Sequence, residues 1–502
     1  MIQNIVFSER QQEEYKEKIA LAKQLADSDP NQSLSLLMPM CEDDPNDPLV
    51  LFIIGYIYLQ AEKLPLAYQI HKRLLELAPH RFEVWTNIGR ICDQMDRYDE
   101  AKEYFEQALS MEQSAGAYAN MAVVSLNMGD MESCVEYSKK GLEIDPDHVN
   151  CWMNLGFGSL GLHDWKTGWK GYEYGLGGRF RKEWVYGDEQ RWDGTPGKNV
   201  VFYGEQGIGD EILFASVIPD AIKDCNEVII DCDKRLEGLF KRSFPDAFVY
   251  GTRRDKEASW PRQHNIDARC ALGGLPEFYR KSDQDFPGIP YLQADPEREI
   301  MWSALFRSWG ERPKIGIAWS GGQIHTQSRF RRLELEQLKP IIDSFDADFI
   351  SLQYKDPGDL SKYGIRHFQA TESDNYDNVA GLVSQLDLVI AVPTAVVHLA
   401  GGLGIPTICL VPKYINWRFQ RDPWVWNKSV NLIRMEGDYI QTLMEAMRDR
   451  LPGFYRGGQE TASSIHSGTV INYPALKQAY LHNAADTPAV THKTPRINRL
   501  HF

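Results

Sequence analysis

A repeat of about 34 residues in the first third of the chain constrains the fold more than any other sequence feature. Large apolar or aromatic residues recur at intervals of 34, 33 and 34 residues, and a small residue follows each of them four positions later. A period of this length is typical of stacked helix pairs, in which each unit buries its apolar face only against its neighbours. Such an array binds partners and has no chemistry of its own. The anchors are Leu51, Trp85, Tyr118 and Trp152, and the small residues are Gly55, Gly89, Ala122 and Gly156.

The repeat pattern also sets expected domain limits. Clear units begin near residues 48, 82, 115 and 149, and in the first three a small residue lies sixteen positions after the anchor, where two helices cross closely. Two amphipathic segments, 9–26 and 31–40, fit a degenerate cap. We therefore expect capping helices over 1–47, repeats over 48–175 and a Gly-, Arg- and Trp-rich connector over 176–197.

From residue 198 the pattern changes to alternating strands and helices, which predicts two Rossmann-like domains over 198–300 and 301–452. We expect 287–308 to link them, a last helix over 438–451, and a tail over 453–502 with one short helix over 473–480. One helix is expected over 210–223. The expected strands are 199–203, 227–231, 248–250, 265–268, 314–319, 348–352, 366–368, 388–392 and 407–411.

Charge and cysteine usage narrow the classes of protein to consider. The chain has 502 residues and a net charge of −15, and residues 1–150 carry 26 Asp and Glu against 13 Lys and Arg. An acidic array repels nucleic acid, so we expect no nucleic-acid partner; the charge serves either solubility or partner selection. The eight cysteines lack metal-site spacing, and the N-terminus shows no apolar leader, which favours a reduced cytoplasmic protein.

One stretch, 388–412, contains no Asp, Glu, Lys or Arg, and its hydropathy is similar to that of a membrane span. Proline and several glycines interrupt it. We expect a strand, a helix and a second strand buried inside a parallel sheet, and no transmembrane segment.

Three motifs are candidates for chemistry. The first is the loop Gly204–Glu211 (GEQGIGDE), which lies between a predicted strand and helix and does not have the dinucleotide spacing. Its Asp210 is either a cap at the start of the helix or a general base at the ligand-binding edge of the sheet. The residue pattern leaves both alternatives open.

The other two motifs lie in the second half. Small residues in the segment 319–322 (WSGG) allow a phosphate to approach the backbone, and the arginines of 329–332 (RFRR) either bind that phosphate or form a solvated basic loop. In the segment 391–402, Thr394 begins a helix whose amides face an anion, and His398 is either a ligand residue or a core residue. The aromatic residues of 417–426 either wall a sugar or base site or belong to the core.

Taken together, these motifs resemble bacterial tetratricopeptide-repeat glycosyltransferases. The resemblance rests on GEQGIGD, WSGG, the doublet Leu352-Gln353, the stretch 384–412 (SQLDLVIAVPTAVVHLAGGLGIPTICLVP) and the segment 416–424 (NWRFQRDPW), and it spans most of 48–451. The catalytic half is similar to the heptosyltransferase group of the GT-B fold. The resemblance implies an N-terminal all-α solenoid followed by two facing Rossmann-like domains, with the acceptor on the first and a nucleotide-sugar on the second.

The resemblance also implies roles for particular residues and an activity without a bound metal or other cofactor. Asp210 is the expected catalytic base of an inverting transfer. One departure is Pro393, which stands where the heptosyltransferase pattern usually has Asp, so the resemblance leaves the identity of the donor open, and a heptose donor in particular. The expected donor-binding residues are Ser320, Gly321, Arg331, Gln353, Thr394, Ala395 and His398, and the expected acceptor-side loop is Glu205, Gln206, Gly207 and Gly209.

The repeat array bears on the acceptor. A concave array grips extended or helical polypeptide, which a sugar or lipid acceptor would not need. We therefore expect transfer from a nucleotide-sugar to Ser or Thr hydroxyls of a protein, with flagellin-like surface proteins as one family-level candidate. Two alternatives remain. One is an inactive binding or scaffold protein, which Pro393 favours, and the other is a transferase acting on a lipopolysaccharide-type glycan.

Overall fold

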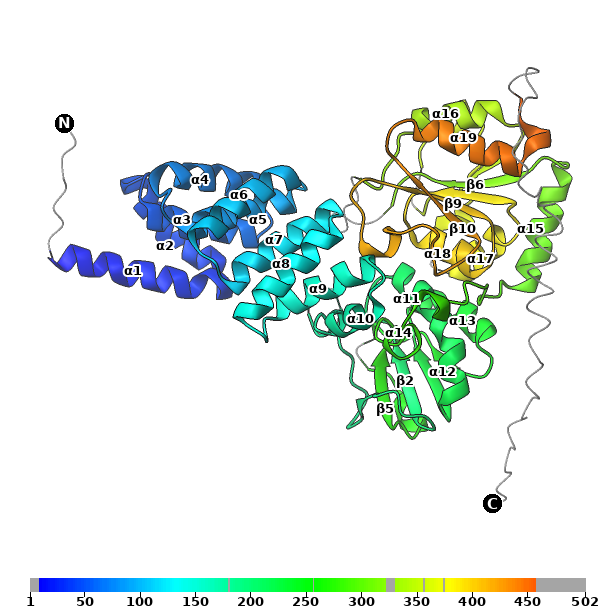
Figure 1. Ribbon diagram of the computed structural model, residues 1–502, viewed down its shortest axis with the longest axis horizontal. Coiled ribbons are helices and arrows are strands. Elements are labelled where there is room, and N and C mark those ends of the chain that lie inside the picture. Colours follow the sequence, from blue (N-terminus) through cyan, green and yellow to red (C-terminus); the bar gives the residue numbers. More distant parts are fainter. Residues whose placement is uncertain are drawn as a thin grey trace.

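A computed structural model describes residues 9–178, 181–255, 257–321, 330–354, 357–372 and 375–456. Two sequence predictions lie outside these ranges: the contribution of Gly322 and Arg329 to the second motif, and the short helix over 473–480. The described residues form a helical arm and two α/β domains (Figure 1). Among the described helices, none has the length and the continuous apolar character that crossing a bilayer requires.

The arm consists of consecutive helix pairs. Helices α3, α5, α7 and α9 begin at the four residues where repeats were expected to start. The elements are α1 (Glu9–Ser28), α2 (Pro30–Asp43), α3 (Pro48–Gln60), α4 (Leu64–Leu77), α5 (Phe82–Gln94), α6 (Tyr98–Met111), α7 (Ala115–Met128), α8 (Met131–Ile144), α9 (Val149–Gly161) and α10 (Trp165–Glu173).

Small side chains let the two helices of each pair cross closely. Ala67, Ala101 and Cys134, the small residues expected at the crossings, have no exposed surface. A Cβ atom on Gly89 would lie 2.6 Å from the ring of Phe105, which is closer than a real contact permits. The repeat positions are therefore fixed by steric fit as well as by hydrophobic burial.

The last pair, α9 and α10, crosses through two glycines. A Cβ atom on Gly171 would lie 2.5 Å from the Gly156 Cα and 2.5 Å from the Trp152 carbonyl oxygen. Although α10 is short, its side chains Trp165, Trp169 and Tyr172 are buried in the same core as the first α/β domain. The arm is thus continuous with the rest of the molecule.

The first α/β domain holds a parallel sheet in the order β1-β5-β2-β3-β4. Three expected strands match β2, β3 and β4, the fourth is displaced by three residues, and β1 lies in the expected connector. The helix expected over 210–223 is divided, because Pro219 begins a new helix more readily than it continues one. The elements are β1 (Gln190–Arg191), β2 (Asn199–Tyr203), α11 (Ile208–Phe214), η1 (Ala215–Val217), α12 (Ile218–Asp224), β3 (Glu227–Asp231), η2 (Lys234–Leu236), α13 (Glu237–Ser243), β4 (Phe248–Tyr250), η3 (Trp260–Gln263), β5 (Ala268–Ala271), α14 (Pro276–Tyr279) and η4 (Asp283–Asp285).

The second α/β domain holds a parallel sheet in the order β10-β9-β8-β6-β7. The strand expected over 366–368 was wrong, since Arg366 makes only an isolated bridge with Ile350. The edge strand β10 was missed, and the expected linker contains a full helix, α15. The elements are α15 (Pro296–Ser308), β6 (Lys314–Ala318), α16 (Leu335–Ser344), β7 (Asp348–Ser351), η6 (Ser361–Tyr363), η7 (Gln369–Glu372), α17 (Tyr376–Val383), β8 (Leu388–Ala391), α18 (Ala395–Gly402), β9 (Thr407–Val411), η8 (Trp417–Phe419), β10 (Val430–Arg434), α19 (Tyr439–Arg450) and η9 (Pro452–Phe454).

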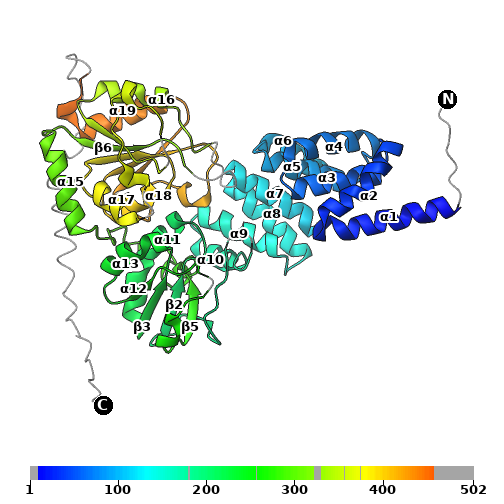
Figure 2. The same ribbon diagram turned by 180° about the vertical axis from the view of Figure 1, so that it is seen from behind.

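The three parts meet at one place. Helix α11 of the first domain packs against α18 of the second, and α9 contacts η8 (Figures 1 and 2). The arm also touches the second domain through Tyr98, whose ring centroid lies 5.9 Å from that of Phe330 and 5.1 Å from that of Tyr414. The charge-free stretch 388–412 forms β8, α18 and β9 inside the second domain, as expected.

The glycine crossing between α9 and α10 gives a stability prediction. We expect Gly171→Ala to lower the free energy of unfolding by about 1–3 kcal/mol, because the new Cβ would collide with backbone atoms. Better helix propensity offsets at most about 1 kcal/mol of this loss. Denaturant unfolding followed by circular dichroism measures the change.

Gly175→Ala is the matched control, because the Cβ added there has its nearest neighbour at 3.4 Å. We expect the control to change stability by less than about 0.5 kcal/mol. Equal stability of the two variants would contradict the close crossing.

Candidate functional site

The first and third sequence motifs come together between the two sheets. Helix α11 follows β2, helix α18 follows β8, and the two helices begin side by side at the carboxyl ends of their strands. A Cβ atom on Gly209 would lie 3.2 Å from the Ala395 Cα, so glycine permits this approach. Open parallel sheets bind ligands at such carboxyl edges.

Asp210 turns toward the second domain. Its Oδ2 accepts a hydrogen bond from the Gly207 backbone N–H at 3.2 Å, which is the cap expected of a first-turn carboxylate. Its Oδ1 lies 2.8 Å from Nη2 of Arg418, which belongs to η8. The side chain is 28% exposed. Asp210 therefore both caps α11 and bridges the two domains.

On the second domain, the expected donor residues lie around the ends of β6, β7 and β8. The Gln353 amide donates to the Ser320 hydroxyl. Nη1 of Arg331 donates to the Pro393 carbonyl at 3.1 Å. A Cβ atom on Gly321 would overlap the methyl group of Thr394. The structure thus brings these residues of the second and third motifs together.

Three polar atoms at this edge are buried without a hydrogen-bond partner among the described residues: Thr394 Oγ1, His398 Nδ1 and Gln353 Oε1. Leaving such groups unpaired costs about 1–3 kcal/mol each, so sites that bind a polar ligand commonly retain them. Burial lowers the pKa of His398 to about 4, and the imidazole is therefore neutral at neutral pH. These atoms offer hydrogen bonds to a polar ligand.

The aromatic residues of the segment 417–426 belong to the core. Trp417, Phe419, Trp424 and Trp426 are each less than 5% exposed. The ring of His398 lies 5.6 Å from Phe419 and 5.7 Å from Trp424, so this core holds the imidazole in place.

The loop expected to face an acceptor is held by hydrogen bonds with residues of the arm and of the first α/β domain. Glu205 is buried, and it accepts hydrogen bonds from Arg181 Nε at 3.2 Å and from the Gly273 N–H at 3.2 Å. Gln206 donates to the hydroxyl of Tyr172, on the last arm helix, at 2.7 Å. The arm therefore supports the loop that carries Asp210.

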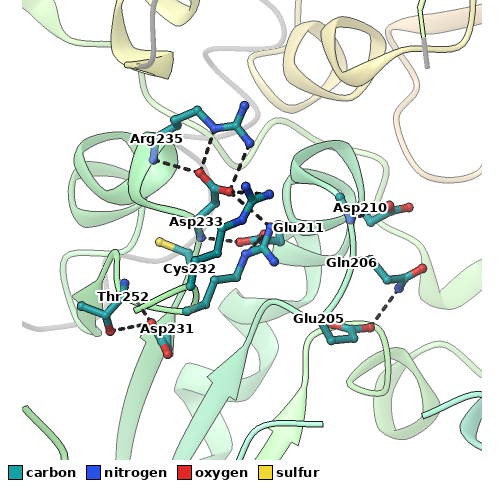
Figure 3. A network of polar contacts seen from close by, with 12 residues as sticks. Glu205, Gln206, Asp210, Glu211, Asp231, Cys232, Asp233, Arg235 and Thr252 are labelled. Atoms are coloured by element: carbon teal, nitrogen blue, oxygen red, sulfur yellow. Dashed lines mark hydrogen bonds and ion pairs between the residues drawn. The ribbon is translucent and has the colours of Figure 1, made fainter. Parts of the chain in front are cut away.

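Sequence reasoning missed two features. One is Arg418, which was noticed only as part of an aromatic cluster. The other is a buried ionic network behind α11, in which Glu211 Oε1 lies 2.5 Å from Arg253 Nε and Glu211 Oε2 accepts from the Asp233 N–H at 2.8 Å (Figure 3). Burial raises the pKa of Glu211. In Figure 3, Glu211 points into this network and Asp210 points away from it.

The arm contains a separate hollow of about 420 Å³. Its walls are the first helices of three consecutive repeats, α5, α7 and α9. Among the described residues, no carboxylate lines it, although the arm as a whole is acidic. The polar lining residues are Thr86, Arg90, Ser114, Asn120, His148 and Asn150.

Comparison with known proteins supports the repeat assignment. A model of the tetratricopeptide repeat matches residues 82–114 and 115–148. Protein FlbA of Caulobacter vibrioides is 25% identical over 404 residues, which cover 72% of this chain and 66% of FlbA, just under two thirds of its length. An alignment of that length extends beyond the repeats into the α/β domains.

Two further similar proteins match a quarter to a third of this chain. Tetratricopeptide repeat protein 8 of Caenorhabditis elegans is 24% identical over 129 residues, or 25% of this chain and 26% of that protein. A solved structure of PilF from Pseudomonas aeruginosa is 17% identical, covers 32% of this chain and 73% of its own, and has a TM-score of 0.29. The chain therefore contains tetratricopeptide repeats and two parallel-sheet domains, and it is similar in sequence to part of FlbA.

The ionic network predicts that replacing Arg253 costs more stability than replacing its neighbour Arg254. We expect Arg253→Gln to lower the free energy of unfolding by about 3–5 kcal/mol, because it removes the buried guanidinium that pairs with both Glu211 and Asp233. Arg254→Gln removes the 65% exposed Arg254, which also pairs with Asp233, and is expected to cost about 1 kcal/mol or less. Denaturant unfolding of both variants measures the difference, and similar costs would contradict a structural role for the network.

Proposed function

We propose that this protein is an inverting glycosyltransferase of the GT-B type, in which two facing Rossmann-like domains bind a nucleotide-sugar and transfer its sugar to a protein hydroxyl. One observation carries the proposal. Asp210 pairs with Arg418 across the junction of two carboxyl sheet edges, and the edge of the second domain buries polar atoms that have no hydrogen-bond partner among the described residues.

The second domain supplies the groups that a diphosphate requires. No side chain of the described residues caps the first turn of α18, whose amides point out of the helix, and the Thr394 hydroxyl and the His398 imidazole lie at this end of the helix. Arg331 and Arg418 add two positive charges. Amides, a helix dipole and arginines stabilise a leaving diphosphate, so the proposed reaction needs no resident metal. Ser320, Gly321 and Gln353 then border the nucleotide-sugar.

The first domain supplies the base. In the proposed step, Asp210 takes the proton of the acceptor hydroxyl as the hydroxyl oxygen forms a bond to the anomeric carbon. The bond between that carbon and the diphosphate oxygen breaks, and the nucleoside diphosphate leaves with the electron pair. A single displacement of this kind inverts the anomeric centre.

The acceptor is proposed to be a protein held by the arm. The hollow between α5, α7 and α9 presents amide, hydroxyl and cationic side chains, which suit the carbonyl groups of an extended polypeptide. Gln206 donates a hydrogen bond to Tyr172 of α10. This bond fixes the position of the arm relative to the loop that carries Asp210.

A second candidate is a binding protein that holds a nucleoside diphosphate without turnover. It is favoured by Pro393, which replaces the Asp of the heptosyltransferase pattern and offers Arg331 only a backbone carbonyl. Binding of a nucleoside diphosphate with no sugar transfer would select this candidate.

The catalytic assignment is tested by Asp210→Asn. We expect transfer to fall by roughly 10²–10⁴-fold, because general-base catalysis contributes that much. The donor is first found by co-expressing the protein with host proteins and measuring intact masses; the rate is then measured with that donor. Asp246→Asn, at an exposed carboxylate of the same domain, should leave the rate unchanged. A fully active Asp210→Asn variant would contradict the assignment.

The acceptor assignment is tested in the hollow of the arm. We expect the double variant Arg90→Ala, Asn120→Ala to raise the KM for the protein acceptor by roughly tenfold, since each tenfold corresponds to about 1.4 kcal/mol. Hydrolysis of the donor in the absence of acceptor should not change. Lys139→Ala, at an exposed residue of α8, is the control. An unchanged KM for the protein acceptor in the double variant would contradict binding of the acceptor in this hollow.

A further inference from the structure

We propose that Arg418 is a donor-responsive positioning residue: it holds Asp210 while the donor site is empty and transfers to the diphosphate when the donor binds. This inference rests on the proposed function of the site. If Arg418 behaves in this way, the donor binds first and the acceptor binds second.

The first argument is that the proposed base, Asp210, already has a bonded partner on each of its oxygens. Both carboxylate oxygens of Asp210 have partners, since Oδ1 lies 2.8 Å from Arg418 Nη2 and Oδ2 accepts from the Gly207 N–H. A general base needs an oxygen within about 2.6–3.2 Å of the proton that it removes. The Gly207 bond caps the helix and stays, so departure of Arg418 frees Oδ1 fully for the acceptor hydroxyl.

The second argument is that Arg418 is not committed to Asp210. Its Nε is buried without a hydrogen-bond partner among the described residues. Its other polar neighbours lie at long distances, with the Gln206 Oε1 3.3 Å and the Tyr172 hydroxyl 3.4 Å from Nη2. A guanidinium has five N–H donors, and these contacts of Arg418 all fall on Nη2, so it can donate further hydrogen bonds to a ligand.

The third argument is the placement of Arg418 in the second domain. It extends from η8 and its guanidinium lies 4.6 Å from the ring centroid of Trp417, which keeps the side chain extended between the domains. Asp210, Arg331 and Arg418 are close enough for their charges to act on His398 in the α18 helix. Arg418 therefore lies within the electrostatic range of the proposed diphosphate site.

The charges decide the direction of the exchange. In the empty site, Arg418 pairs with the Asp210 carboxylate, and the Asp210 charge also acts on Arg331. A diphosphate brings two negative charges and several oxygens, and a guanidinium binds phosphate oxygens in a bidentate manner. The diphosphate thus competes with Asp210 for Arg418, and the carboxylate is released beside the anomeric carbon.

The test is a double-mutant cycle measured by calorimetric titration of the full chain. Wild type, Asp210→Asn, Arg418→Gln and the double variant are titrated with UDP, GDP, ADP, CDP and dTDP, and the best ligand of wild type is used throughout. We expect Asp210→Asn to bind it roughly 3–10-fold more tightly, because the competitor for Arg418 is gone. Arg418→Gln should bind roughly 10–100-fold more weakly, because a charge-assisted bidentate contact is lost.

The double variant distinguishes transfer of Arg418 from Asp210 to the diphosphate from simple repulsion between Asp210 and the diphosphate. If Asp210 acts only by repelling the ligand, Asp210→Asn tightens binding equally with or without Arg418. If Arg418 exchanges, Asp210→Asn has no effect once Arg418 is replaced. Arg421→Gln, at an exposed residue three positions away, should leave the affinity unchanged.

The outcomes are distinct. Equal tightening in both backgrounds, or no tightening in the wild-type background, overturns the exchange and leaves the proposed transferase intact. Absence of binding by wild type to all five nucleotides overturns the proposed function together with the exchange. If melting curves show that Arg418→Gln does not fold, Arg418→Lys replaces it; lysine keeps the charge but loses the bidentate contact, and the effect of Asp210→Asn should shrink in that background.

Discussion

The contact between α11 and α18 is the constraint on which the rest of the structure depends. Gly209 and Ala395 are small enough for the two helices to begin side by side, and that approach sets Asp210 opposite Arg418. A larger residue at Gly209 would separate the two sheet edges. The candidate site is therefore a property of the junction and belongs to neither α/β domain alone.

The arm belongs to the same assembly. Helix α10 completes a repeat on one side and buries Trp165, Trp169 and Tyr172 in the core of the first α/β domain on the other. The arm touches the second domain through Tyr98 as well. Because both α/β domains hold the arm, a partner bound in its hollow would have a fixed position relative to Asp210.

Much of this arrangement is predictable from the sequence, and the exceptions have physical causes. Buried parallel strands are continuous apolar runs, so β2, β3 and β9 were located to the residue, and the repeats follow from their spacing. The strand β10 was missed because its exposed Asn431 interrupts the apolar run. The segment 366–368 was expected as a strand, but among the described residues it forms only one isolated bridge, between Arg366 and Ile350. Arg418 was missed as a partner of Asp210, because only the fold brings residues so distant in sequence together.

The most direct measurement of the central claim is a crystal structure of the full chain with a bound nucleoside diphosphate. The account predicts the diphosphate beside the first turn of α18, with hydrogen bonds from Thr394 and a guanidinium, and Asp210 facing the space next to the terminal phosphate. A diphosphate bound elsewhere in the molecule, with the junction of α11 and α18 unchanged, would contradict it.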